Sequence, residues 1–331
     1  MKNKKVVPLR QQHLKLRHLI LSSIRDYFHT EGFLEVEVPI LVKKTTPDTY
    51  IDSIQADGGY LTTSTEYQIK RLMADGMEKV YTLTKNFRAN DRGRYHSPEF
   101  TMLEWGRAYQ TLQVIEEDIV QFIRKAFREL YPDQDSLNFN GNEIDFMNGA
   151  WESLTVREAF QKYLGITNLG DFSLETLSKA SHESGVLLPS DFQSDRSLAI
   201  SFLLDLLQSC LGKHTPTFLH EWPSYLTSSA PLSSDDPHIA ERSELYIGGV
   251  EIANGFPFLT DPHKQRELFE EQNLKRRELG KPVIEVDEKY IQALKNLPQG
   301  AGMALGVDRL VMILTQASQL SDVQAFDWDE L

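Results

Sequence analysis

Apolar residues recur along the chain with two different periods. Those between residues 11 and 30 recur at helical spacing and are Leu14, Leu21, Ile24 and Phe28. Gly32 follows as a helix stop signal. Residues 33–38 then alternate between apolar and polar side chains until Pro39, which lacks the N–H that a strand ladder needs. The pattern therefore predicts a helix over 11–30 and a strand directly after it.

The next part of the chain predicts a long hairpin. Residues 60–109 indicate short strands around one helix near 66–74, followed by two long strands over 78–88 and 99–109. A polar loop separates the two long strands. A loop of this size inside a domain more often carries function than not, so the hairpin tip is a candidate site.

The rest of the chain first favours helices and then strands again. A capping box, Thr155 to Glu158, opens a helix that runs to residue 164. Further predicted elements are a helix over 111–131, a turn-rich stretch over 132–148, strands over 217–222 and 244–253, a charged helix over 262–279, and a glycine-rich stretch over 300–306 that leads into a helix from 308.

Strands dominate both ends of the chain, helices dominate the middle, and the two do not alternate regularly. This order favours an α+β fold with an antiparallel sheet flanked by helices. We expect a single domain over residues 1–331 with a helical insertion at about 136–213.

Composition narrows the class of protein. The chain has 331 residues and a formal charge of −13, from 35 Lys and Arg against 48 Asp and Glu. This balance disfavours an extended nucleic-acid footprint, which needs basic residues to displace counterions. No apolar run approaches the roughly 20 residues of a membrane helix, and no apolar stretch follows the basic residues 1–5 as a secretion signal requires. The single cysteine allows no disulfide within the chain. We expect a cytoplasmic protein without a membrane partner.

Two glutamates flank a predicted tight turn. Gly248 and Gly249 lie between two alternating runs and predict a two-residue hairpin. Tyr246 would then lie opposite Glu251. Glu244 would be the diagonal neighbour of Glu251, at roughly 7–8 Å. Two carboxylates at that spacing can share a divalent cation that also carries phosphate oxygens. The alternative is a pair of solvated glutamates on an exposed face.

The tip of the long hairpin is unusually basic. Residues 86–100 contain three arginines and a histidine in an otherwise acidic protein, and a guanidinium can bind two phosphate oxygens at once. This favours an anion site, although a flexible basic loop without a ligand has the same composition. On the returning strand one face carries Phe100, Met102, Glu104 and Gly106.

A third candidate lies near the end of the chain. Residues 300–306 contain three glycines, which permit close approach of a ligand to the backbone, and Arg309 follows in the first turn of a helix. A glycine-bearing strand that enters a helix is also common without any such function.

Together these segments resemble the three motifs of class II aminoacyl-tRNA synthetases. The helix and strand ending in Pro39 resemble the first motif, residues 86–104 the second, and residues 306–309 the third. The pattern is most similar to that of lysyl-tRNA synthetases. Because the first motif begins near Gln11, we expect no anticodon-binding barrel before it. Ala304 stands where the tRNA enzymes have glycine, as in the elongation factor P lysine ligases, which resemble truncated lysyl-tRNA synthetases.

The resemblance implies an activity and a set of ligands. The ligase family adenylates (R)-β-lysine with ATP and Mg²⁺ and transfers it to a lysine of elongation factor P, without tRNA, and we expect a homodimer. Arg88 and Arg309 are the implied catalytic residues. The implied ATP-binding residues are Arg88, Ala89, Asn90, His96, Ser97, Phe100, Glu244, Leu245, Gly306 and Arg309. Magnesium is assigned to Glu244 and Glu251. The implied residues for the amino acid are Ser64, Thr65, Glu66, Glu104, Gly106, Glu251, Phe258 and Ala304.

The sequence departs from the family pattern at five of these positions. Thr65 replaces a proline, Asn90 a glutamate and Ser97 an asparagine. Gly106 stands where the family has a tyrosine that contacts the substrate. Phe258 stands where lysine-specific members have a glutamate for the distal ammonium, which leaves Glu104 as the acid that could replace it.

Three hypotheses follow. The first is a ligase that attaches (R)-β-lysine or lysine to elongation factor P. The second is the same adenylation chemistry with a different, less polar amino acid or another acceptor, as Gly106 and Phe258 indicate. The third is a catalytically inactive, synthetase-like binding protein.

Overall fold

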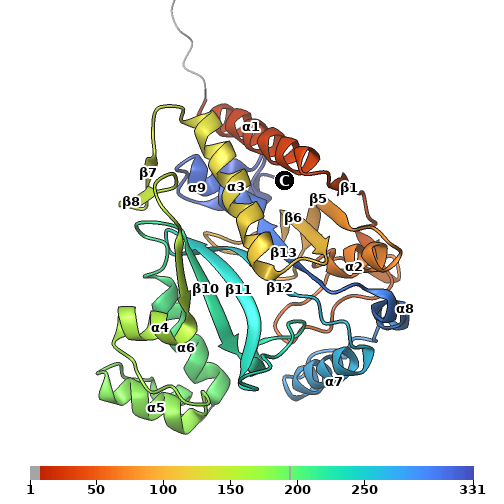
Figure 1. The fold of residues 1–331 in the computed structure, drawn as a ribbon, viewed down its shortest axis with the longest axis vertical. Coiled ribbons are helices and arrows are strands. Elements are labelled where there is room, and N and C mark those ends of the chain that lie inside the picture. Colours follow the sequence, from red (N-terminus) through yellow and green to blue (C-terminus); the bar gives the residue numbers. More distant parts are fainter. Residues whose placement is uncertain (1–7, 194) are drawn as a thin grey trace, which may run out of the picture.

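An eight-stranded sheet runs through the centre of the molecule. The computed structural model describes residues 8–193 and 195–331 (Figure 1). The strand order is β1-β5-β6-β13-β12-β11-β10-β9. The bounds are β1 Leu34–Glu35, β5 Lys79–Phe87, β6 Glu99–Ala108, β9 Glu152–Thr155, β10 Thr217–Pro223, β11 Ile239–Ile247, β12 Val250–Pro257 and β13 Gly300–Gly306. The six inner strands pair antiparallel, and only the edge strands β1 and β9 pair parallel to their neighbours. The α+β fold with a mostly antiparallel sheet is therefore confirmed.

Helices cover one face of this sheet. The helices α1 (Leu9–Thr30), α3 (Leu112–Leu130) and α9 (Val307–Leu314) lie on the same side of the strands (Figure 1). Their apolar residues share one hydrophobic core with alternate residues of the sheet, such as Leu103, Trp105, Ala301 and Leu305. Because strand side chains alternate between faces, the residues between these, such as Glu104 and Gly302, lie on the other face.

A buried ion pair ties the helices to the sheet. The carboxylate of Asp308, at the start of α9, lies 2.5 Å from the guanidinium of Arg17 on α1. The same carboxylate accepts a hydrogen bond of 2.7 Å from the backbone N–H of Thr101 on β6. Asp308 therefore fixes the position of the α9 N-terminus, and with it the neighbouring Arg309.

Smaller elements surround the open face of the sheet. The helices α2 (Glu66–Ala74), α7 (Pro262–Glu278) and α8 (Glu288–Ala293) contribute to a separate apolar cluster that includes Phe258 and Phe269. The residues just before α2 in the chain form a three-stranded sheet, in the order β2 (Leu41–Val42), β4 (Gly59–Leu61) and β3 (Gln55–Ala56).

The middle of the chain packs in a second apolar cluster, which it shares with β10 and β11. The helices α4 (Val156–Ala159), α5 (Leu174–Glu183) and α6 (Arg196–Gln208) lie together beside β9 and β10 (Figure 1). The capping box of Thr155 and Glu158 is present as predicted. The expected insertion at 136–213 is helical only from Val156, because residues 136–155 form β9 and the hairpin of β7 (Ser136–Phe139) and β8 (Asn142–Asp145).

Most predicted elements lie within a few residues of those observed. The turn-rich interpretation of 132–148 missed the β7–β8 hairpin, which turns at Asn140 and Gly141, both with positive φ. The strand expected over 33–38 is reduced to the two residues of β1. No helix among the described residues combines the length and the apolar character needed to cross a bilayer.

Candidate active site

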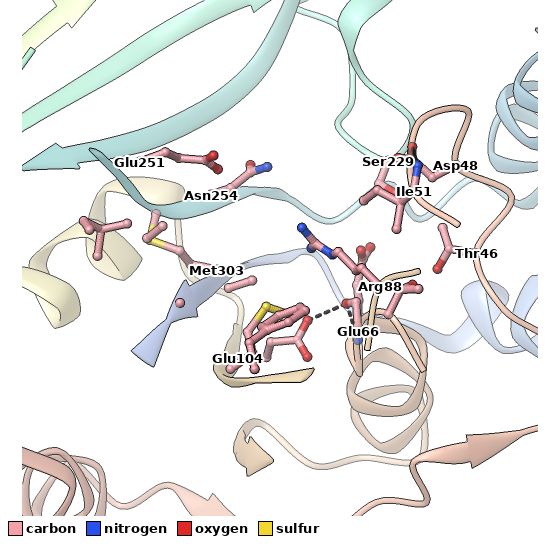
Figure 2. A pocket seen from close by; sticks show the side chains of 18 of the residues that line it. Thr46, Asp48, Ile51, Glu66, Arg88, Glu104, Ser229, Glu251, Asn254 and Met303 are labelled. Atoms are coloured by element: carbon pink, nitrogen blue, oxygen red, sulfur yellow. Dashed lines mark hydrogen bonds between the residues drawn. The ribbon is translucent and has the colours of Figure 1, made fainter. Parts of the chain in front are cut away.

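A cavity of about 420 Å³ lies on the open face of the sheet. Twelve of the eighteen residues expected in the site line it, namely Ser64, Glu66, Arg88, His96, Ser97, Phe100, Glu104, Glu251, Phe258, Ala304, Gly306 and Arg309. Figure 2 shows Arg88 inside the cavity, between Glu251 and Asn254 on one side and Thr46 and Asp48 on the other. Residues from the three candidate segments therefore meet in one place.

Arg88 is presented to this cavity with part of its guanidinium unpaired. It follows β5 and is held by its backbone N–H, which donates to the carbonyl of Pro98 at 3.0 Å. Its Cζ lies 5.1 Å from the ring centroid of Phe100. Its Nε is buried and has no hydrogen-bond partner among the described residues. A buried N–H donor without a partner is costly, so an anionic ligand is the natural complement of Arg88.

Arg309 is fixed against the hairpin tip. Its Nε donates to the carbonyl of Tyr95 at 3.1 Å and its Nη1 to the carbonyl of Glu251 at 2.8 Å. Its Nη2 lies 2.7 Å from Nε2 of His96. Burial, and then the charge of Arg309, lower the pKa of His96, which keeps the imidazole neutral as an acceptor. The basic tip is therefore an ordered wall of the cavity.

Glu104 organises the loop that precedes α2. One carboxylate oxygen accepts a hydrogen bond from the hydroxyl of Ser64, and the other accepts from the hydroxyl and the backbone N–H of Thr65, the latter at 2.6 Å. Burial raises the pKa of Glu104, while these three donors lower it. Both oxygens are therefore already engaged by the protein, and the compensating role expected of Glu104 would add a substrate ammonium to these three donors.

Glu66 and Lys70 form an ion pair at the same end of the cavity. Nζ of Lys70 lies 2.6 Å from Oε1 of Glu66, one helical turn earlier on α2. The ammonium also lies 5.2 Å and 5.5 Å from the ring centroids of Phe256 and Phe258. Glu66 therefore has one carboxylate oxygen that is not engaged by Lys70.

The hairpin of β11 and β12 has the predicted Gly248–Gly249 turn, with Tyr246 opposite Glu251. A register shift between Leu245 and Tyr246 then places Glu244 opposite Asn254. The simple diagonal relation of the two glutamates therefore does not hold, because one extra residue of β12 is inserted between them.

Glu244 is buried and paired within the protein. Its carboxylate forms an ion pair with Arg242 and accepts a hydrogen bond of 2.5 Å from the hydroxyl of Tyr246. Burial raises the pKa of Glu244 to about 7; Arg242 acts in the opposite sense, and the nearby charge of Glu251 raises the pKa further. Glu251 lines the cavity, and one of its oxygens lies 3.6 Å from Nη1 of Arg309.

These two carboxylates have the donor chemistry of a magnesium site. Mg²⁺ prefers oxygen ligands and commonly binds one or two carboxylates together with substrate phosphates and water. Glu244 and Glu251 repel one another, and a cation would relieve that repulsion. The described residues contain no group of three or more metal-ligating side chains, so phosphate or water would have to complete the coordination.

Six expected residues do not line the cavity with the others. Glu244 lies behind Arg242, and Leu245 is fully buried in the core on the opposite face of the sheet. Thr65 and Gly106 lie behind the cavity wall, against Glu104 and Phe258 respectively. The remaining two are Ala89 and Asn90, which form the bend after β5.

Several residues of the cavity wall were not predicted from the sequence. Arg242 lies two positions before Glu244 on β11, and Phe256 two positions before Phe258, so strand alternation was the available signal. Lys70 lies four positions after Glu66 and therefore on the same helix face. Asp48 lies in an irregular segment between β2 and β3, where no sequence signal was available.

Comparison with known proteins identifies the family. Residues 4–329 match the family model described as tRNA synthetases class II (D, K and N). A protein of Photorhabdus laumondii named elongation factor P–(R)-beta-lysine ligase is 38% identical over 326 residues, which cover 95% of this chain and 94% of the relative. Proteins with the same name from Salmonella arizonae and Avibacterium paragallinarum are each 35% identical, over 96% and 95% of this chain and 95% of each relative. The chain therefore belongs to the class II tRNA synthetase family of the D, K and N type.

Proposed function

We propose that this protein is an ATP-dependent ligase that adenylates an amino acid, (R)-β-lysine or lysine, and transfers it to a lysine side chain of elongation factor P. The observation that carries the proposal is Arg88, whose buried Nε has no partner among the described residues and which lines the same cavity as Phe100, Glu66 and Arg309. Family membership and the shared name of the relatives support the same chemistry.

The first step is attack of the amino acid carboxylate on the α-phosphorus of ATP. A P–O bond forms to the carboxylate oxygen, the bond to the pyrophosphate oxygen breaks, and pyrophosphate leaves. The carboxylate is already ionised at neutral pH, so no general base is needed. The contribution of the protein is to position the two reactants and to stabilise charge on the phosphate, and Arg88 is placed for both tasks.

Two side chains are suited to hold the adenine base. The ring of Phe100 and the guanidinium of Arg309 both line the cavity, and each presents a planar group. Arg309 is fixed by the carbonyls of Tyr95 and Glu251, so it can stack on a base without further ordering. His96 and Ser97 lie beside it for polar contacts to the nucleotide.

Magnesium belongs to this proposal as the partner of the phosphates. Glu244 and Glu251 would hold it, and when bound it would neutralise negative charge on the pyrophosphate leaving group. Arg242 would then have to release the oxygen of Glu244 that it now binds. The protein's own part is to keep both carboxylates close to the cavity.

The second step transfers the aminoacyl group. The neutral amine of the acceptor lysine attacks the carbonyl carbon of the adenylate, an amide bond forms, and AMP leaves while the amine loses a proton. We assign elongation factor P as the acceptor because the relatives carry it in their name. The formal charge of −13 agrees with a protein rather than a tRNA as acceptor. The proposal includes the cytoplasmic location expected from the sequence, since ATP and translation factors are found there.

A homodimer is also part of the proposal. The N-terminal elements expose large apolar side chains that a second copy of the chain could cover. These are Leu9 and Leu19 on α1, Leu34 on β1 and Leu41 on β2, each between 45% and 64% exposed. Light scattering is expected to give the mass of two chains.

The direct test is ATP–pyrophosphate exchange with (R)-β-lysine and with lysine. The proposal predicts exchange that depends on the amino acid and that Arg88→Ala abolishes. Absence of exchange with every amino acid, together with absence of Mg-ATP binding in calorimetry, would instead favour the inactive binding protein.

A further inference from the structure

Three glycines form a slot that holds the ring of Phe258. A Cβ atom added at Gly106 would lie 3.0 Å from Cζ of this ring, one at Gly302 3.0 Å from Cε1, and one at Gly300 3.0 Å from Cε2. Gly106 is on β6 and pairs with Gly302 on β13. Larger residues at these positions would press on the ring, and they would meet Met73 and the carbonyl oxygens of Trp105 and Arg107 at still shorter distances. The glycines therefore allow both the place of the ring and the close approach of the neighbouring groups. Phe258 is 5% exposed and forms part of the cavity wall.

The carboxylates of Glu104 and Glu66, in the cavity wall, already have partners within the protein. Both oxygens of Glu104 accept hydrogen bonds from Ser64 and Thr65. Oε1 of Glu66 pairs with Lys70, which leaves only Oε2 for a ligand. An amino acid has an amino group near its carboxylate, and we assign the remaining oxygen to that group.

A positive charge of the protein already lies at the aromatic wall. The side chain of Lys70 is only 2% exposed, and its ammonium faces the rings of both Phe256 and Phe258. A second ammonium at the end of a substrate side chain would be repelled by Lys70. Of the carboxylate oxygens of Glu66 and Glu104, only Oε2 of Glu66 has no partner among the described residues, and the amino group near the substrate carboxylate takes it. Asp48, also in the cavity wall, already accepts from the backbone N–H groups of Tyr50 and Ile51. A methyl group, in contrast, would pack on the rings without losing hydration.

We propose that the cavity recognises the side chain of its amino acid by apolar contact alone, without a partner for a terminal ammonium. The substrate class then includes neutral amino acids with the chain length of lysine, activated at least as well as their cationic counterparts. This inference rests on the proposed adenylation chemistry and leaves the acceptor unchanged. It assigns specificity to Phe258 and its glycine slot, with Lys70 as the charge that disfavours a second cation.

Two matched pairs of amino acids test the inference with the unmodified protein. (R)-3-Aminohexanoic acid differs from (R)-β-lysine only in lacking the terminal amine, and L-norleucine differs from L-lysine in the same way. The measurement is kcat/KM for amino-acid-dependent ATP–pyrophosphate exchange with all four compounds. We expect the neutral member to equal or exceed the cationic member in at least one pair.

The outcomes separate the inference from the proposed function. Higher kcat/KM for the cationic member in both pairs would overturn the inference and leave the proposed ligase activity intact. Exchange with none of the four compounds would overturn the proposed activation of a lysine-length amino acid, and the inference with it. A neutral member that equals or exceeds its counterpart supports both.

Substitutions at the aromatic wall give a second readout. Phe258→Glu adds a carboxylate beside the rings and is expected to shift the ratio of cationic to neutral kcat/KM upward by at least tenfold. Phe258→Leu is the matched control, since it shortens the side chain but keeps the wall apolar, and it is expected to leave the ratio within about threefold of the original. Equal ratios in the two variants would contradict a role of this wall in specificity.

Discussion

Arg242 forms an ion pair with the carboxylate of Glu244, two residues further along the same strand. The two side chains point to the same face of β11, and Arg242 also reaches the carbonyl of Leu226 and the side chain of Asn254. Glu244 is the carboxylate that we assign to magnesium. Arg242 is therefore an internal cation that favours the charged form of this buried acid, against the burial that raises its pKa to about 7.

The first prediction concerns this ion pair. Arg242→Met is expected to destabilise the protein by about 3 kcal/mol, because it leaves the buried Glu244 beside Glu251 without its cation. The double variant with Glu244→Gln is expected to recover part of that loss, since the charge that needed a partner is gone. Urea unfolding of the wild type, both single variants and the double variant measures the coupling. If the loss of stability in the double variant equals the sum of the losses in the two single variants, Arg242 and Glu244 are not coupled.

The second prediction concerns Arg88. Arg88→Ala is expected to lower kcat/KM for ATP–pyrophosphate exchange by roughly 100- to 1000-fold, because it removes the charged donor assigned to the reacting phosphate. Arg88→Lys keeps the charge but not the planar group. Its kcat/KM is expected to lie between that of the wild type and that of Arg88→Ala. The free energy of unfolding should change little in either variant, since Nε of Arg88 has no partner among the described residues. A loss of stability with unchanged exchange would show that Arg88 is structural.

The third prediction concerns the loop held by Glu104. Glu104→Ala removes the acceptor for three donors of Ser64 and Thr65 and is expected to cost about 3 kcal/mol in the free energy of unfolding. Glu104→Gln retains one carbonyl oxygen and is expected to cost less. Urea unfolding compares the two variants with the wild type. Equal stability of all three proteins would mean that the loop does not depend on these hydrogen bonds.

The fourth prediction follows from the titration of the same carboxyl group. Burial raises the pKa of Glu104 above its ordinary value of 4.5. A raised pKa in the folded state stabilises the protein below the pKa of the unfolded state, and this contribution is lost as the pH rises through the folded value. The stability of the wild type relative to Glu104→Gln should therefore decrease as the pH rises from about 4 to 8. A relative stability that increases over this range would contradict the raised pKa.

Local sequence patterns predicted much of the fold and most of the residues that line the cavity. Strong periodicity predicted α1, α2 and α3, and the Gly248–Gly249 turn fixed the pairing of Tyr246 with Glu251. Alternation on β6 placed Phe100 and Glu104 on the cavity side of the sheet. In each case a few neighbouring residues were enough to decide the structure.

Other features depended on contacts between distant segments. The bulge that separates Glu244 from the simple diagonal position is not visible in the pattern of β11 and β12. The hydrogen bonds of Glu104 join a loop and a strand 39 and 40 residues apart, so the sequence left this acid as a free partner for a substrate. The glycine slot of Phe258 likewise joins three parts of the chain.

Transfer of an activated amino acid to elongation factor P can be followed by intact-mass spectrometry. Purified elongation factor P is incubated with this protein, Mg-ATP and (R)-β-lysine or its neutral analogue. We expect the mass of elongation factor P to increase by one aminoacyl residue, in a reaction that depends on ATP and is lost with Arg88→Ala. An unchanged mass of elongation factor P, under conditions where ATP–pyrophosphate exchange proceeds, would contradict the assigned acceptor.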